Sequence, residues 1–153
     1  MRLTRASEYA IRCISYLSRI GTGVSVPKKE IAAFSEIPES FLAKIAQDLN
    51  KAGLIEIRQG SKGGYVLLKA PEEITLLEVV EIMIGRITLN DCVGRPSSCP
   101  VSPRCLVHQV WDDASAQLRT TLAGVNFAEI SQEEHCLPLT SSLSLNLSDS
   151  EKY

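Results

Sequence analysis

The segment LIEIRQGSKGGYVLLKA, residues 54–70, is the feature that most restricts the fold. Residues 54–58 alternate between apolar and polar side chains, residues 65–69 form a second β-prone run, and a basic, glycine-rich turn at residues 59–64 separates them. This pattern predicts a β-hairpin. Because the residues before it have the spacing of helices, we expect the hairpin to be the wing of a small helical unit.

Three helical segments precede the hairpin. Apolar residues spaced by three and four over residues 3–20 predict a first helix, with Thr4 as its N-cap. Two further helices are expected over residues 27–34 and 38–52, each beginning at a proline, with Gly53 as the final C-cap. The predicted fold class is therefore mainly α with a small β-hairpin wing: a winged helix-turn-helix plus a long C-terminal dimerisation helix.

The second half is expected to be an accessory region with its own helices. Thr75–Glu78 has the sequence of a capping box that opens a helix ending near Ile84, and residues 85–103 have the composition of a loop. An apolar stripe then predicts a long helix over residues 104–125, formed by Val107, Trp111, Ala114, Leu118, Leu122 and Val125. Since residues 1–70 contain apolar stripes of their own, this helix is expected to pair with a second copy of the chain.

The resulting domain organisation has three parts. Residues 1–70 form the winged helix-turn-helix, and residues 71–132 hold the linker helix, a cysteine loop at residues 86–105 and the dimerisation helix. Residues 133–153 are rich in serine and show no helical stripe, so we expect a disordered tail.

Charge is divided unevenly along the chain. Residues 1–70 carry 11 Lys and Arg against 6 Asp and Glu, whereas residues 71–153 carry 5 against 12. A basic half suits a phosphate backbone, although uneven solvation of two ends, or a winged helix that binds protein, would give the same pattern. The contacts expected with double-stranded DNA are Arg2, Thr4, Arg5, Ser40, Phe41, Lys44, Arg58, Lys62 and Gly63.

The expected DNA contacts differ in kind. Ser40 and Lys44 lie near the start of the third helix, where side chains reach base edges. Phe41 would meet a thymine methyl group or pack against a neighbouring helix. The basic residues of the hairpin turn suit phosphate or minor-groove contact, because glycines there allow a close approach.

The cysteine loop contains candidate metal ligands. Cys92, Cys99, Cys105 and His108 follow the spacing C-x6-C-x5-C-x2-H, and thiolates with one imidazole suit an iron–sulfur cluster or zinc. The loop lacks the C-x2-C pair typical of structural zinc, which favours a cluster. Cys13 lies on the apolar stripe of the first helix and is expected to be a core residue.

Several segments resemble the Rrf-type family of winged-helix iron–sulfur transcriptional regulators. They are the opening MRLT, SFLAKIAQDLNKAGLIEI, the wing GSKGGYVL, ITLLEVVEIM, the three-cysteine loop and CLVHQVW, and together they extend over residues 1–132. The resemblance implies a homodimer that binds DNA and holds a cluster, [2Fe–2S] or else [4Fe–4S], through Cys92, Cys99 and Cys105.

The resemblance offers two candidates for the fourth ligand. The CLVH stretch at residues 105–108 favours His108, as in cluster-regulating members, whereas nitric-oxide-sensing members use an acidic residue of the partner subunit's first helix, where this chain has Glu8. Two positions depart from the family pattern. The first cysteine gap is six residues rather than five, and Ala43 stands where a cluster-regulating relative has a DNA-reading glutamate.

The leading functional prediction is a cytoplasmic regulator that senses redox, iron–sulfur or nitric oxide status. The alternatives are a winged-helix DNA-binding protein with a structural zinc and a cluster-free thiol switch. The sequence has no nucleophile–base constellation, phosphate loop or paired carboxylates, so we do not expect an enzyme. No apolar run is long enough for a membrane helix, and the N-terminus lacks the features of a secretory signal.

Overall fold

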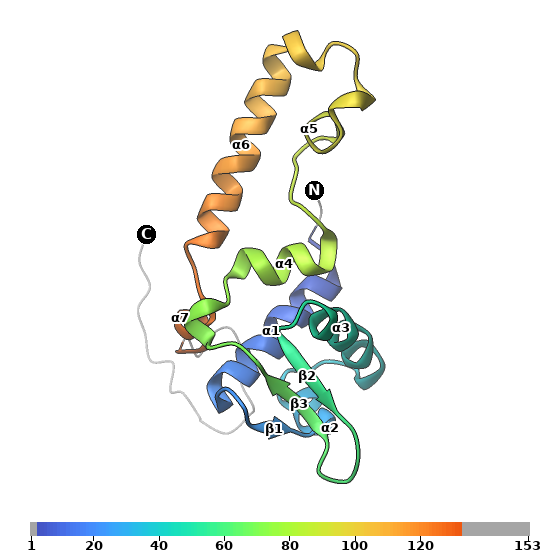
Figure 1. Ribbon diagram of the computed structural model, residues 1–153, viewed down its shortest axis with the longest axis vertical. Helices are drawn as coiled ribbons and strands as arrows, with labels where there is room; N and C mark the ends of the chain where they lie inside the picture. The colour runs from blue at the N-terminus through green and yellow to red at the C-terminus, as the bar shows by residue number, and fades with distance from the viewer. Residues whose placement is uncertain (1–2, 133–153) are drawn as a thin grey trace, which may run out of the picture.

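The computed structural model describes residues 3–132 and shows a helical body from which one long helix extends (Figure 1). Its helices are α1 (Arg5–Ile20), α2 (Lys28–Phe34), α3 (Glu39–Lys51), α4 (Leu76–Ile84), α5 (Asp91–Gly94), α6 (Leu106–Ala123) and α7 (Phe127–Gln132). The strands are β1 (Ser25–Val26), β2 (Ile55–Arg58) and β3 (Gly64–Leu67), and 3-10 turns occur at Pro71–Glu73, Pro96–Ser98 and Ser102–Arg104. Arg2 and the tail expected at residues 133–153 lie outside the described residues.

The sheet is antiparallel, with the strand order β1-β3-β2. Strands β2 and β3 are the predicted hairpin, with Ile55 opposite Leu67 and Arg58 opposite Gly64. Strand β1 adds to the free edge of β3 and was not predicted, because two residues are too few to show alternation. The fold class predicted from the sequence, mainly α with a small β wing, is confirmed.

The helix ends agree closely with the capping signals. The hydroxyl of Thr4 accepts a hydrogen bond from the Ser7 amide at 3.3 Å. At the end of α3, the amides of Gly53 and Leu54 donate to the carbonyls of Asn50 and Leu49, and Gly53 takes a φ of 74°. This is a Schellman motif, which requires a left-handed residue and thus explains the glycine.

The capping box expected at the start of α4 is only half formed. The Thr75 hydroxyl accepts from the Glu78 amide at 3.1 Å. The Glu78 carboxylate, however, accepts from Lys69 Nζ at 2.7 Å instead of turning back to the Thr75 amide. This ion pair joins α4 to the end of the hairpin.

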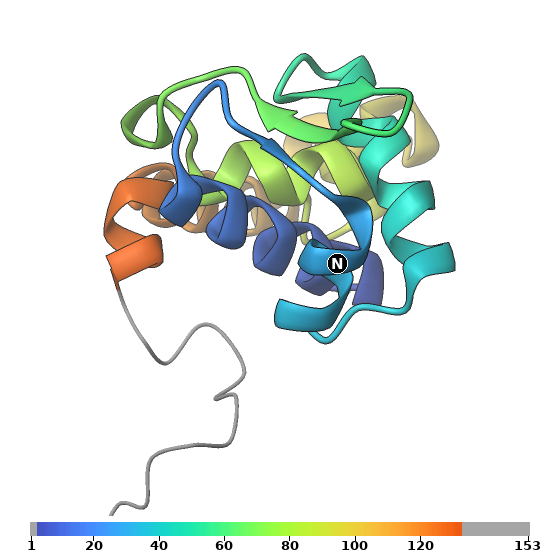
Figure 2. The same cartoon turned by 90° about the horizontal axis from the view of Figure 1, so that it is seen from below.

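The core extends past the domain boundary expected at residue 70. Fully buried residues of α1, α3 and the sheet form one cluster with Ile74, Val79 and Phe127, and Ile130 joins it at 8% exposure. Helices α4 and α7 both pack against α1, and Figure 2 shows α7 and α3 on opposite sides of the body. The winged unit therefore shares its core with two helices of the accessory region.

Helix α6 makes few contacts with the body. Ser115 is the one buried residue among its 18, and Figure 1 shows the helix rising from α7 to carry the cysteine loop at its far end. The loop contains α5 and two 3-10 turns, so it is less irregular than predicted. Among residues 3–132, no helix combines the length and the apolar character needed to cross a membrane.

Candidate functional site

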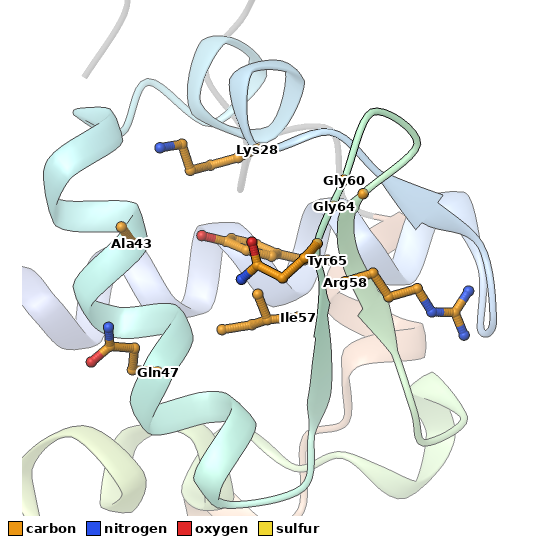
Figure 3. Close-up of a pocket in the computed structure, with 10 residues that line it drawn as sticks. Lys28, Ala43, Gln47, Ile57, Arg58, Gly60, Gly64 and Tyr65 are labelled. Atoms are coloured by element: carbon orange, nitrogen blue, oxygen red, sulfur yellow. The ribbon is translucent and has the colours of Figure 1, made fainter.

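A groove of about 410 Å³ separates α3 from the wing (Figure 3). Ala43 and Gln47 form the α3 wall, Ile57 and Tyr65 come from the sheet, and Lys28 lies at the start of α2. The wing contributes mainly backbone, since it lines the groove with Gly60, Gly63 and Gly64 as well as with Arg58 and Gln59. The sequence motifs for helix and wing thus meet around one open groove.

The residues expected to read bases lie on the outward face of α3. Ser40 and Lys44 are exposed, while Leu42 and Ile45 between and beyond them are buried. Phe41 is 45% exposed, and its ring packs edge-on against Tyr9 of α1 with centroids 5.6 Å apart. The packing role for Phe41 is therefore present, and the residue is still partly exposed.

The wing carries two basic side chains, Arg58 and Lys62. Figure 3 shows Arg58 pointing away from α3, and its Nε donates to Glu56 Oε2 at 2.9 Å. Lys62 is exposed at the turn. A Cβ atom at Gly63 would collide with the carbonyl oxygen of Arg58, so the tight turn requires glycine there.

The start of α1 exposes Arg5 but uses Thr4 for structure. The Thr4 hydroxyl accepts from the Ser7 amide and contacts the Ser7 hydroxyl at 3.2 Å. Arg2, which the sequence suggested as a DNA contact, lies outside the described residues.

The structure adds Lys28 and Gln47 to the candidate residues, because both line the groove. Lys28 lies near the groove with its Nζ 3.4 Å from Glu39 Oε2. Gln47 follows Ala43 by one helical turn on the same wall. Helical periodicity places Gln47 on the outward face of α3, but no local signal brings Lys28 to the groove, because it comes from another helix.

The three cysteines of the loop are free and partly buried. Cys92 lies in α5, Cys99 follows the 3-10 turn Pro96–Ser98, and Cys105 is the N-cap of α6. Cys13, in contrast, is fully buried in the core, and burial raises the pKa of its thiol to about 12. The prediction that Cys13 is a core residue is confirmed.

His108 lies in the first turn of α6, and its Nδ1 atom is buried without a hydrogen-bond partner. An unpartnered buried ring nitrogen is costly unless a water, a ligand or a metal binds it. Glu8, the other candidate, lies on α1 and accepts from Arg12 Nη2 at 2.6 Å. The donor set thus suits a soft metal centre, but no three metal-binding side chains within residues 3–132 converge on a common point.

Polar contacts connect the base of the loop to α4 and α6. Glu81 of α4 accepts from Arg119 of α6 at 2.8 and 3.3 Å, and also from the Ile87 amide at 2.9 Å. The hydrogen bond from Arg119 is the main reason that the pKa of Glu81 is lowered. The Ser115 hydroxyl accepts from the Leu89 amide at 3.0 Å, so the segment between α4 and α5 is attached to α6 directly through Ser115 and indirectly through Glu81.

Comparison with known proteins gives consistent matches over the described region. The profile of Rrf2, described as an iron-dependent transcriptional regulator, matches residues 3–133. The HTH-type transcriptional regulator NsrR of Geobacillus kaustophilus is 30% identical over 138 residues, covering 90% of this chain and 94% of that protein. The regulator IscR of Photorhabdus laumondii is 29% identical over 137 residues, covering 90% and 83%.

Solved structures show the same fold. CymR of B. subtilis, named the global cysteine regulator, superimposes with a TM-score of 0.69 at 19% identity, covering 86% of this chain and 97% of that one. IscR of T. potens gives a TM-score of 0.68 at 20% identity, covering 88% and 90%.

Proposed function

This chain belongs to the Rrf2 family of DNA-binding transcriptional regulators, which are not enzymes, and from that premise we propose a homodimeric regulator whose cysteine loop holds an iron–sulfur cluster. The observation that carries the proposal is the loop itself. The loop carries three free, partly buried thiols, and the helix that follows it begins with Cys105 as N-cap and with His108, whose Nδ1 atom is buried and unpartnered.

The DNA contacts are assigned to α3 and the wing. Helix α3 enters the major groove, where Ser40, Lys44 and Gln47 face base edges. Arg58 and Lys62 of the wing contact phosphates or the adjacent minor groove. Base contacts specify the DNA sequence, whereas phosphate contacts position the protein on DNA of any sequence. Lys62→Ala is expected to weaken binding on all sequences, and Lys44→Ala chiefly on the specific site. Equal losses on specific and random duplexes would reject this division of roles.

Dimerisation is assigned to α6. Its exposed apolar side chains include Leu106 at 73%, Val107 at 57% and Val110 at 53%, and they continue to Trp111 at 38%. A long helix with one buried residue and a row of exposed apolar side chains is typical of a helix that pairs with a partner. A two-fold dimer also suits DNA, since it presents two recognition helices to a palindromic site.

The dimer proposal is tested by charge substitution on α6. Val107→Asp should give a monomer in sedimentation velocity at concentrations where the wild type is a dimer. Gln109→Asp, on an exposed position of the same turn, is the matched control. A monomeric wild type would reject the proposal, and so would a Val107→Asp variant that remains dimeric.

The cluster is assigned to Cys92, Cys99 and Cys105, with His108 as the fourth ligand and Glu8 of the partner subunit as the alternative. When bound, such a cluster supplies a centre that responds to oxidants, nitric oxide and iron–sulfur supply. Because the donors do not converge in the described structure, the loop must close when it binds the group. The preference for [2Fe–2S] over [4Fe–4S] comes from the family resemblance.

The residues between loop and DNA provide a route for the response. Arg119 and Ser115 of α6 bind the end of α4 and the segment that follows it. Helix α4 packs in turn against α1 and α3. A change in loop conformation that moves α6 therefore acts on the helix that supports the recognition helix, which is how a bound group would alter DNA affinity.

Anaerobic purification followed by visible absorption and by iron, sulfide and zinc analysis tests the cofactor. A coloured protein with iron and sulfide supports the cluster, whereas a colourless protein with stoichiometric zinc supports the structural-zinc alternative. A colourless, metal-free protein whose DNA affinity changes on thiol oxidation supports the cluster-free thiol switch. Cys99→Ala should abolish the colour, and Cys13→Ala, which removes a buried thiol of the core, should retain it.

The fourth ligand is tested by the rate at which visible absorption is lost in mild chelator. His108→Ala should make the cluster labile, whereas Glu8→Ala should leave it at the wild-type rate. The reverse result would place the partner's Glu8 in the site.

A further inference from the structure

The geometry of DNA indicates what would occupy the groove between α3 and the wing. This inference rests on the proposed function. When a helix occupies the major groove and a wing reaches the adjacent minor groove, the sugar–phosphate strand that separates the two must pass between them. In this protein the space between α3 and the wing is the groove of about 410 Å³. Its wing side includes the backbone of Gly60, Gly63 and Gly64, its α3 side begins with the small Ala43, and the side chains of Ile57 and Tyr65 line it between these two walls.

One cation lies within this groove and points toward α3. Figure 3 shows Lys28 directed across the groove toward α3, while Arg58 points away from it. Lys28 is paired with Glu39, the first residue of α3, at 3.4 Å, and the two side chains are 41% and 47% exposed. An ion pair with that much exposure is weak, so a phosphate can displace the carboxylate.

We propose that the groove binds the DNA strand that separates the two contacted grooves, with Lys28 as its phosphate ligand and Glu39 as the anion that the phosphate displaces. Glu39 thus limits affinity for DNA of any sequence, because each binding event must first free Lys28. The ion pair also holds the lysine beside the groove when no DNA is bound.

The chain offers matched controls for both residues. Lys29 is the exposed neighbour of Lys28 and does not line the groove. Asp48 lies on the same helix as Glu39, is 49% exposed and forms a comparable pair with Lys51 at 3.6 Å, but it is also absent from the groove lining. Each control removes the same charge from the same helix as the test variant.

The experiment measures anisotropy of a labelled random-sequence duplex about three helical turns long in a salt series from about 50 to 200 mM. Lys28→Gln should lower the slope of log K against log salt by about 0.9, and weaken binding about eightfold near 0.1 M, for each bound protomer. Lys29→Gln should change both by much less. Glu39→Gln should tighten binding roughly two- to fivefold, the range expected from a surface ion pair.

Asp48→Asn should stay within about 1.5-fold of the wild type, because exposed charges outside the site are screened. In the double variant Lys28→Gln/Glu39→Gln the gain from removing Glu39 should vanish. Equal effects of Lys28→Gln and Lys29→Gln would overturn the inference, as would a Glu39→Gln variant that binds no more tightly than Asp48→Asn. A folded wild type that fails to bind any duplex would instead reject the proposed function.

Discussion

Phe127→Ala tests whether α7 completes the core of the winged helix. Phe127 is fully buried in the same cluster as residues of α1 and the sheet. Its amide donates to the Ile74 carbonyl at 3.0 Å, and the Leu76 amide donates to the Val125 carbonyl at 2.9 Å, which fixes α7 beside α4. Because the backbone holds the helix in place, we expect the cavity left by alanine to collapse little.

The expected cost is large relative to the stability of a small domain. Phe-to-Ala replacements in cores cost about 3–5 kcal/mol, and domains of this size have about 5–15 kcal/mol in total. At a urea slope near 2 kcal/mol per molar, a loss of about 4 kcal/mol lowers the midpoint by about 2 M. Gln132→Ala, on an exposed position of the same helix, should shift the midpoint by less than about 0.25 M.

The assay is urea unfolding at fixed protomer concentration, because a dimer's stability depends on concentration. Far-UV circular dichroism follows the helices as a whole. Trp111 is the only tryptophan of the chain and lies on α6, so its fluorescence follows that helix separately. A fragment ending at residue 103, which lacks α7, should show no cooperative transition.

A midpoint shift below about 0.5 M in Phe127→Ala would refute this account of the core. A cooperative transition in the fragment ending at residue 103 would also refute it, since residues 1–70 would then be able to fold on their own apolar stripes.

Three further outcomes are expected. The hydrogen bond from Arg119 is the main cause of the lowered pKa of Glu81. The ion pair therefore stabilises the fold at pH values above the ordinary pKa of a carboxyl group, and this stabilisation is lost as the pH falls through the lowered pKa of Glu81. The urea midpoints of wild type and Glu81→Gln should therefore differ at about pH 7 and converge once the pH falls below the lowered pKa of Glu81. Thr4→Ala should cost about 1 kcal/mol in urea unfolding through loss of the α1 N-cap. In peptide mapping after alkylation of the native metal-free protein, Cys13 should be protected and the three loop cysteines modified.

Features with local causes could be predicted from the sequence. Thr4, Gly53 and Thr75 determine helix ends through hydrogen bonds to residues no more than three positions away, or through one left-handed φ angle. The hairpin is similarly local, because its strands and turn are adjacent in the chain. These signals gave the helix and strand boundaries of the winged unit to within one or two residues.

Features that depend on distant contacts could not be predicted in this way. Strand β1 is defined by its partner β3 some forty residues later, and its own two residues carry no pattern. Helix α7 is too short for periodicity to distinguish it from the end of α6. Lys28 becomes a groove residue only because α2 and the wing are brought together by the fold.

The cysteine loop has one feature that the sequence predicts and one that it does not, and the difference affects how the proposed regulator would work. The residue types at Cys92, Cys99, Cys105 and His108 predict metal ligands from the sequence alone. In the described structure, however, these side chains do not meet at a common point. Cys105 is the N-cap of α6 and His108 lies in its first turn, directly beside the apolar residues assigned to the dimer. Under the proposed function, a group that binds Cys105 and His108 therefore also orders the start of the helix on which the partner subunit packs. Binding of the group and pairing of the subunits would then stabilise each other, and the spacing of the two recognition helices would depend on both.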